Sequence, residues 1–115
     1  MKHISDNKRL TNAFKTIYRL LNRLEKGLDA DDFDAAVQIG SKAPEITDNR
    51  WRNYIKMLLK DGYIEGVDIR TVIDSEEDID ISEIQITIKG LEYLAKNTMM
   101  IRAYNTVKSI KYIVK

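Results

Sequence analysis

Six polar side chains between residues 49 and 60 have the types and the spacing of a nucleic-acid contact. Arginine and asparagine can read the edges of guanine and adenine, and lysine suits phosphate oxygens. On a helix, five of the six fall on one stripe opposite Tyr54 and Leu58, and Arg50 sits beside that stripe near its N-terminal end. Such residues are also typical of any solvated helix face, so both interpretations stay open. The candidate DNA-binding residues are Asn49, Arg50, Arg52, Asn53, Lys56 and Lys60.

Metal binding and catalysis find less support in the residues. Alternating acids after residue 73 resemble a calcium loop, but Ile79 and Gln85 stand where that loop needs glycine and glutamate. A second acidic group, at residues 29–34, has Phe33 in place of its third ligand. The only histidine is His3, and there is no cysteine. We therefore expect no metal site, no cofactor, no catalytic residue and no enzymatic activity.

The candidate residues belong to the third of three predicted helices. Apolar residues recur at steps of three and four over residues 7–27, which predicts a first helix with its basic residues mostly off the apolar face. Acids followed by apolar residues predict a short helix over residues 32–39. Thr47 or Asp48 is the expected cap of the third helix, which runs to about Asp61. The buried stripe expected for the first helix comprises Leu10, Phe14, Ile17, Leu21, Leu24 and Leu28.

Beyond the third helix the apolar period changes from 3.6 to 2, which predicts a β-hairpin. Its strands cover residues 64–73 and 79–88, and the connection at residues 74–78 is almost entirely acidic. A change of phase between Ile81 and Ile84 indicates a bulge or bend in the second strand.

Two further helices are predicted after the hairpin. Thr87 is the expected cap of the first, at residues 89–96, and Asn97 is its expected end. The second, at residues 98–114, has a wide apolar face. This face either packs back onto the first helix or pairs with its copy in a second subunit. Such a homodimer would space two third helices for two half-sites.

This order of elements predicts a winged helix, an α+β fold in which the hairpin is the wing and the third helix is presented to a partner. A length of 115 residues is typical of one domain, so we expect a single winged-helix domain over residues 1–115. Three helices, the wing and two C-terminal helices follow in that order, and the helix at residues 98–114 is an addition to the basic fold.

Several segments also carry a resemblance to a known family. The most specific is Ile86-Thr87-Ile88-Lys89-Gly90-Leu91-Glu92-Tyr93-Leu94, and it continues in Asn97-Thr98-Met99-Met100, Ala103-Tyr104 and Ile110-Lys111-Tyr112-Ile113. The segment from Ile46-Thr47-Asp48 to Asp61-Gly62-Tyr63-Ile64 also resembles this family. About two-thirds of the chain thus resembles the YjcQ-like proteins of Gram-positive bacteria and their prophages. The resemblance implies a winged helix with an added C-terminal helix and, by inference from that fold, DNA binding. It implies no catalytic residue and no cofactor.

The charges are segregated along the chain although the net charge is only +1. Residues 1–27 and 84–115 each carry +5, and residues 28–83 carry −9. Phosphates would repel the acids of the wing. The wing is therefore a solvated hairpin tip, a contact for a basic protein surface, or a device that prevents non-specific nucleic-acid binding. The acids concerned are Asp74, Glu76, Glu77, Asp78, Asp80 and Glu83.

Two functions remain in competition at the level of the sequence. The chain has no apolar run long enough to span a bilayer and no signal-peptide pattern, so we expect a cytoplasmic protein without a membrane partner. The leading hypothesis is a transcriptional regulator-like protein, of prophage origin, that binds double-stranded DNA through its third helix. In this hypothesis Lys60 and the basic residues of the first helix contact phosphates, and the other five candidate residues face the major groove. The alternative is a protein-interaction module that keeps the winged-helix shape without binding DNA.

Overall fold

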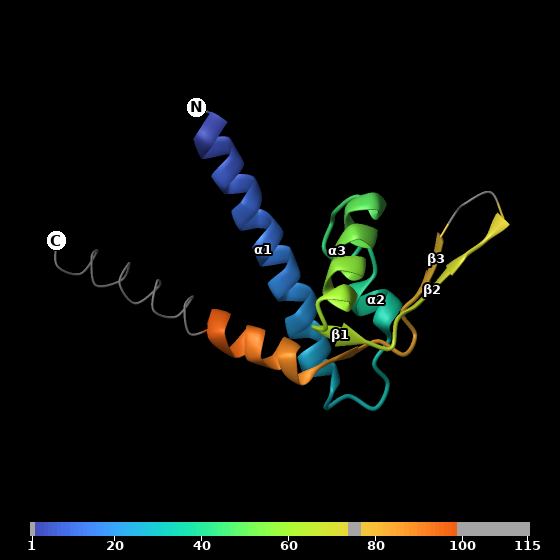
Figure 1. Ribbon diagram of the computed structural model, residues 1–115. Helices are drawn as coiled ribbons and strands as arrows, with labels where there is room; N and C mark the ends of the chain where they lie inside the picture. The colour runs from blue at the N-terminus through green and yellow to red at the C-terminus, as the bar shows by residue number, and fades with distance from the viewer. Residues whose placement is uncertain (1, 74–76, 99–115) are drawn as a thin grey trace.

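The fold is described from a computed structural model, which covers the backbone of residues 2–73 and 77–98 and their side chains from Arg9 onward. Three helices are followed by four short strands that form two separate two-stranded antiparallel sheets, β1 with β4 and β2 with β3 (Figure 1). A further helix over residues 88–98 follows β4. This is a mixed α+β architecture. The elements are α1 Lys2–Gly27, α2 Ala35–Ile39, α3 Asp48–Lys60, β1 Ile64–Glu65, β2 Asp68–Thr71, β3 Glu77–Asp80 and β4 Gln85–Ile86.

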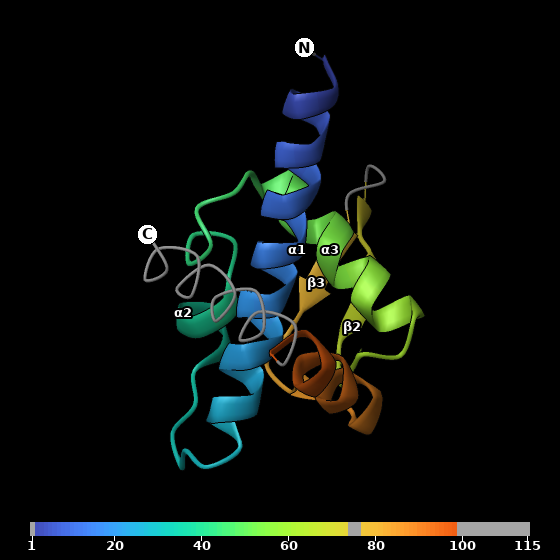
Figure 2. The ribbon, with the colours of Figure 1, turned by 90° about the vertical axis from the view of Figure 1, so that its left-hand side faces the viewer.

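Among the side chains of the long helix α1 that the structure describes, from Arg9 onward, the buried ones lie in its C-terminal half. Leu20, Leu21 and Leu24 are at most 4% exposed, whereas Leu10 is 60% and Phe14 is 58% exposed. The predicted stripe is therefore wrong at its N-terminal end, because this half of α1 projects beyond α3 (Figures 1 and 2). Leu28, which follows the end of the helix, is exposed as well.

Side-chain caps set the bounds of α2 and α3. Asp34 has an extended backbone and accepts hydrogen bonds from the amides of Ala36 and Val37, so α2 begins at Ala35 and not at the predicted residue 32. Thr47 accepts from the amide of Arg50 at 3.1 Å, which confirms the predicted start of α3.

The buried face of α3 positions this helix in the core. Trp51, Tyr54, Ile55 and Leu58 are all buried, and they share one apolar cluster with the C-terminal half of α1. The indole of Trp51 also donates a buried hydrogen bond of 2.7 Å to the carbonyl of Ile39, at the end of α2. The opposite face of α3 is left outward, as the sequence predicts.

The predicted hairpin is confirmed, but it is divided into two ladders. In β1–β4, Ile64 pairs with Ile86, and in β2–β3, Asp68 pairs with Asp80. Gly66 separates the two ladders at a φ of +78°, and a Cβ there would lie 2.0 Å from the carbonyl oxygen of Glu83. On the other strand, a tight turn between Ile81 and Ile84 buries both isoleucines, which confirms the predicted change of phase.

The helix over residues 88–98 is capped by Thr87, as predicted, and it extends further than predicted. Asn97 does not end it: residues 97 and 98 are both helical, and the Asn97 amide donates back to the carbonyl of Tyr93 at 2.8 Å. Thr98 lies against α1, with its hydroxyl 2.6 Å from that of Tyr18. The rest of the predicted helix at residues 98–114, and with it the predicted dimer contact, lies outside the described residues.

Thr87 joins the start of this helix to the end of α3. Its hydroxyl donates to the carbonyl of Gly62 and accepts from the amide of Gly90 at 3.1 Å, while its own amide donates to the carbonyl of Tyr63. Nearby, the Lys89 ammonium donates to the carbonyl of Asp61 at 2.7 Å and lies over the ring of Tyr63. The two chain segments are thus held together by polar contacts as well as by the strand pairing.

We predict that Thr87→Val destabilises the protein by about 1–3 kcal/mol, because valine keeps the shape but supplies neither the donor nor the acceptor. Thr87→Ser keeps the hydroxyl and is the matched control, with an expected loss below about 1 kcal/mol. Urea unfolding followed by the fluorescence of Trp51 measures both. Equal stability of the valine and serine variants would contradict the assigned role of the hydroxyl.

Candidate nucleic-acid interface

Helix α3 carries all six residues predicted to contact DNA, and its surroundings divide them into three groups. Asn49, Asn53 and Lys60 lie on the outward face and are exposed. Their side chains form no hydrogen bond or ion pair with any side chain or backbone group that the structure describes. Amide and ammonium groups in this state are available to an incoming partner. These three remain predictions, because nothing bound to the face tests them.

Arg50 lies on the side of α3 that faces α1. Its guanidinium donates a hydrogen bond of 2.8 Å to the hydroxyl of Tyr54 and lies 5.8 Å from the centre of the same ring. These contacts hold the cation in place while leaving the residue exposed. A shallow groove between the helices brings Arg50 close to Arg9 of α1, above the apolar side chains of Leu10 and Ala13. Two arginines on neighbouring helices are therefore displayed along one groove.

Arg52 and Lys56 lie on the opposite side of α3 and are already engaged by the β2–β3 hairpin. Arg52 donates from its Nε to Asp48 at 2.8 Å and from its Nη1 to the backbone carbonyl of Glu77. The ammonium of Lys56 forms an ion pair with the carboxylate of the same Glu77. One residue at the start of β3 thus contacts two of the six predicted DNA-binding side chains.

The charges around Arg52 stabilise its protonated form. The hydrogen bond to Asp48 raises the pKa of Arg52 above its ordinary value, and the negative charges of Asp48, Glu77 and Asp78 act in the same direction. Loss of water around the side chain acts against this rise. Arg52 is therefore a permanent cation that the acidic hairpin surrounds on one side.

The acids of the hairpin are less free than the sequence suggests. Arg70 on β2 forms an ion pair with Asp68 at 2.8 Å, and its guanidinium lies 3.9 Å from Asp80. The backbone amide of Ser82 donates to the carboxylate of Asp80, which lowers the pKa of Asp80, with smaller contributions from the Ser82 side chain and Arg70. Glu77 is paired with α3, so the described hairpin acids are in part neutralised by the chain's own cations.

Two participants are missing from the set predicted from the sequence. Arg9 was not singled out because its approach to Arg50 depends on how α1 packs against α3. Glu77 was counted as a repelling acid of the wing, whereas it is the partner of Arg52 and Lys56. The segregation of charge along the chain was the one available signal, since it predicts attraction between the middle acids and the helix cations.

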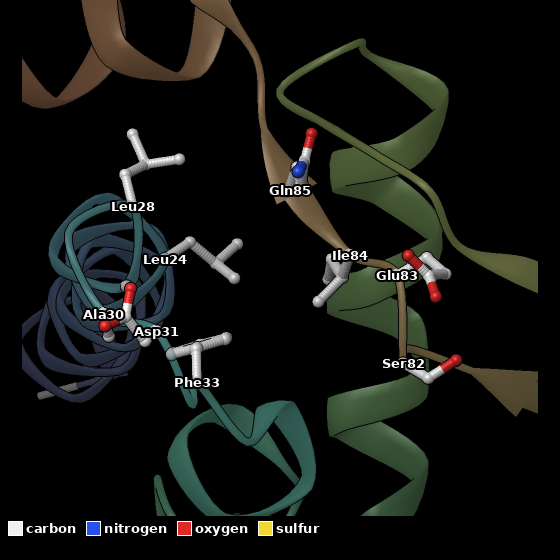
Figure 3. A pocket seen from close by; sticks show the side chains of 10 residues that line it. Leu24, Leu28, Ala30, Asp31, Phe33, Ser82, Glu83, Ile84 and Gln85 are labelled. Carbon is white, nitrogen blue, oxygen red and sulfur yellow. The ribbon is translucent and has the colours of Figure 1, made fainter.

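A separate cavity of about 300 Å³ lies at the C-terminal end of α1 (Figure 3). Leu24 and Leu28 face Ile84 across it, and Phe33 forms its floor in this view. Among the described residues that line it none is basic, and the charged ones are the acids Asp31 and Glu83. The cavity therefore has an apolar side, formed by Leu24, Leu28, Phe33 and Ile84, within a mainly polar lining that includes two acids.

Residues 2–73 and 77–98 offer neither a metal site nor a membrane span. This part of the chain holds no group of three or more histidine, cysteine or acidic side chains arranged to bind a metal ion. None of its helices is both long enough and apolar enough to cross a membrane.

The fold and the site together define a small α+β protein with a polar, cation-bearing helix face that its own acidic hairpin partly covers. Residues 18–113 match the family model described as YjcQ protein, which covers most of the chain. The chain belongs to this family, and the resemblance seen in the sequence is confirmed. No curated protein and no solved structure matches it.

We predict a coupling energy of about 0.2–1 kcal/mol between Lys56 and Glu77 in a double-mutant cycle with Lys56→Met and Glu77→Gln. The small size follows from exposure, since the two side chains are 37% and 38% exposed. The coupling should fall toward zero in about 1 M salt. Urea unfolding of the four proteins of the cycle measures this coupling energy. The cycle of Lys60→Met with Glu77→Gln is the control, and we expect no coupling energy there. The same coupling in both cycles would contradict a specific pair.

Proposed function

We propose that the chain is a winged helix that binds double-stranded DNA through α3. The order of the elements supports this interpretation: α1, α2 and α3 form the helical part, β1–β4 joins it, and β2–β3 is the wing. In such a fold the third helix enters the major groove with one face packed on the core. The buried face of α3 and its polar outward face have that arrangement.

The observation that carries the proposal is the exposed, unpartnered stripe of Asn49, Asn53 and Lys60. Asparagine can pair with the N6 and N7 atoms of adenine, so two outward asparagines one helical turn apart supply sequence-reading groups. Lysine at the C-terminal end of the stripe suits a phosphate. A face made only to be solvated has no need of asparagines, which are poor helix formers.

The flanking arginines supply a second part of the interface. Arg50 and Arg9 lie along the groove between α3 and α1, next to the outward stripe. A helix laid in the major groove brings its flanks close to the two phosphate backbones, where guanidinium groups bind phosphate oxygens strongly. The protein would then act as a regulator of transcription by occupying a DNA site.

We predict that Arg50→Ala and Lys60→Ala each weaken binding to a random-sequence duplex by about three- to tenfold at low salt and reduce the salt slope by about one. Fluorescence anisotropy at several salt concentrations measures both quantities. Lys26→Ala is the matched control, since Lys26 lies in the last turn of α1 in a hollow shared with Asp32 and Asp34. Equal losses in all three variants would contradict α3 as the contact.

A second candidate function, a protein-interaction module, is favoured by the cavity at the end of α1. Its apolar side can receive part of a leucine or phenylalanine side chain, and the acids in its mainly polar lining favour a basic partner. The acids at residues 29–34 extend this negative surface. The partner would be a basic protein surface, as the acidic wing also suggests, but contact would be centred on the cavity and not on the wing.

For this second function we predict that a synthetic peptide of alternating lysine and leucine shifts the amide resonances of Leu24, Phe33 and Ile84. Asp31→Asn should weaken the binding by about two- to fivefold, since it removes charge at the rim. Glu92→Gln, an exposed acid on the helix over residues 88–98, is the control and should have no effect. Resonance changes confined to α3 or the β2–β3 hairpin would contradict the cavity as the site.

A further inference from the structure

Glu77 is the point at which the acidic hairpin meets the cationic side of α3. Its carboxylate pairs with the ammonium of Lys56, and its backbone carbonyl accepts from the guanidinium of Arg52. Both cations lie on the flank of α3 beside the outward stripe of Asn49, Asn53 and Lys60 that the proposed function turns toward DNA. The nitrogen atoms that would contact phosphates therefore already have anionic or carbonyl partners within the same molecule.

We infer that Glu77 determines specificity by withholding Arg52 and Lys56 from phosphates until a duplex offers base contacts as well. This inference rests on the proposed function and makes Glu77 the residue that controls access of DNA to two cations of α3. Non-specific affinity comes almost entirely from phosphate contacts, whereas sequence-specific affinity adds contacts with bases. Withholding two cations therefore removes a larger share of the non-specific binding free energy than of the specific binding free energy. The ratio of specific to non-specific affinity rises as a result.

The position of the outward residues makes this discrimination workable. Asn49 and Asn53 are exposed and lie beside the paired cations on the same helix, and their side chains form no hydrogen bond with any group that the structure describes. A duplex can therefore engage both asparagines before the hairpin is displaced. Phosphates then compete with Glu77 for Lys56 and Arg52 only after that first contact, which a mismatched sequence does not complete.

The strength of the contact suits a displaceable partner. Lys56 and Glu77 are both more than one-third exposed, and exposed pairs of this kind are weak. A buried pair would keep the cations permanently, and no pair at all would leave them open to any phosphate. The half-exposed geometry lies between these limits, so the expected effect on affinity is modest and measurable.

The salt dependence of DNA binding follows from the same pairing. A cation that binds phosphate releases counterions, and each such contact steepens the dependence of affinity on salt. On a random-sequence duplex, Lys56 stays paired with Glu77 and neutralises no phosphate, so it releases no counterion from the DNA. The wild-type slope should therefore be shallower than the number of cations on α3 suggests.

The test is binding of Glu77→Gln to a random-sequence duplex of about 20 base pairs, at several salt concentrations between about 50 and 200 mM. We expect the variant to bind about three- to tenfold more tightly than the wild type, with a slope steeper by about one. Glu77→Asp keeps the net charge but shortens the reach to Lys56, and we expect it to bind more tightly than the wild type also. Circular dichroism checks that each variant is folded.

The control for net charge is Glu83→Gln, which removes one negative charge from the turn between β3 and β4, at the rim of the cavity. We expect an increase of less than about twofold, because Glu83 forms no ion pair with any described cation of α3. If Glu83→Gln and Glu77→Gln strengthen binding equally, net charge and not the contact is responsible, and the inference is overturned. An unchanged affinity for Glu77→Gln overturns it too.

A second measurement separates failure of this inference from failure of the proposed function. The rate at which acetic anhydride modifies Lys56, read by mass spectrometry without DNA, should rise in Glu77→Gln and stay unchanged in Glu83→Gln. An unchanged rate overturns the inference whatever the DNA result. Wild-type binding with no response to Glu77 overturns the inference alone, whereas no binding by any form at low salt overturns the DNA-binding function and the inference with it.

Discussion

Two residue pairs between β1 and β4 are the constraint on which the rest of the molecule depends. Ile64 and Ile86 are both buried, and their pairing joins the end of α3 to the start of the helix over residues 88–98. The same join fixes the base of the β2–β3 hairpin, where Gly66 lets the backbone approach Glu83 more closely than any side chain would permit. The place of the hairpin beside α3 follows from this short ladder, and so does the contact between Glu77 and the helix cations.

The near-neutral net charge of the chain arises from surfaces of opposite sign that partly face one another. The hairpin acids and the α3 cations neutralise each other locally, Arg70 pairs with acids on its own sheet, and the acidic connection after α1 adjoins the cavity. The surfaces that remain open include a polar stripe on α3 with cations at its edges and, elsewhere, a hollow with acidic, polar and apolar lining residues. Attraction between folded segments thus selects which charges are left for a partner.

Local signals in the sequence account for most of the element boundaries. Helices are capped by the side chains of Thr47 and Thr87, and α3 is ended by the backbone conformation of Gly62. These effects are local, so they can be predicted from the sequence without the tertiary structure. The exposed Leu10 and Phe14 were not predictable, because periodicity shows that a face is apolar and not whether anything covers it. The sequence placed the six α3 residues away from the buried stripe, and the structure leaves all six exposed or partly exposed, with Arg50 on one flank and Arg52 and Lys56 on the other. The role of Glu77 was not predictable, since it depends on a contact across 21 residues of chain.

The uneven burial of α1 divides one continuous helix into two regions of different local stability. Residues 20–24 lie in the core, and the hydroxyl contact between Tyr18 and Thr98 ties the next turn to the C-terminal helix. Toward the N-terminus, exposed side chains leave the backbone hydrogen bonds with little tertiary support. In hydrogen exchange, we expect the backbone amides of the second half of α1 to become accessible together with those of α3 and the β1–β4 pair. The amides around Leu10 should exchange by local fraying, while the rest of the fold stays intact. The groove that displays Arg9 is therefore built on the part of the helix that the core restrains least.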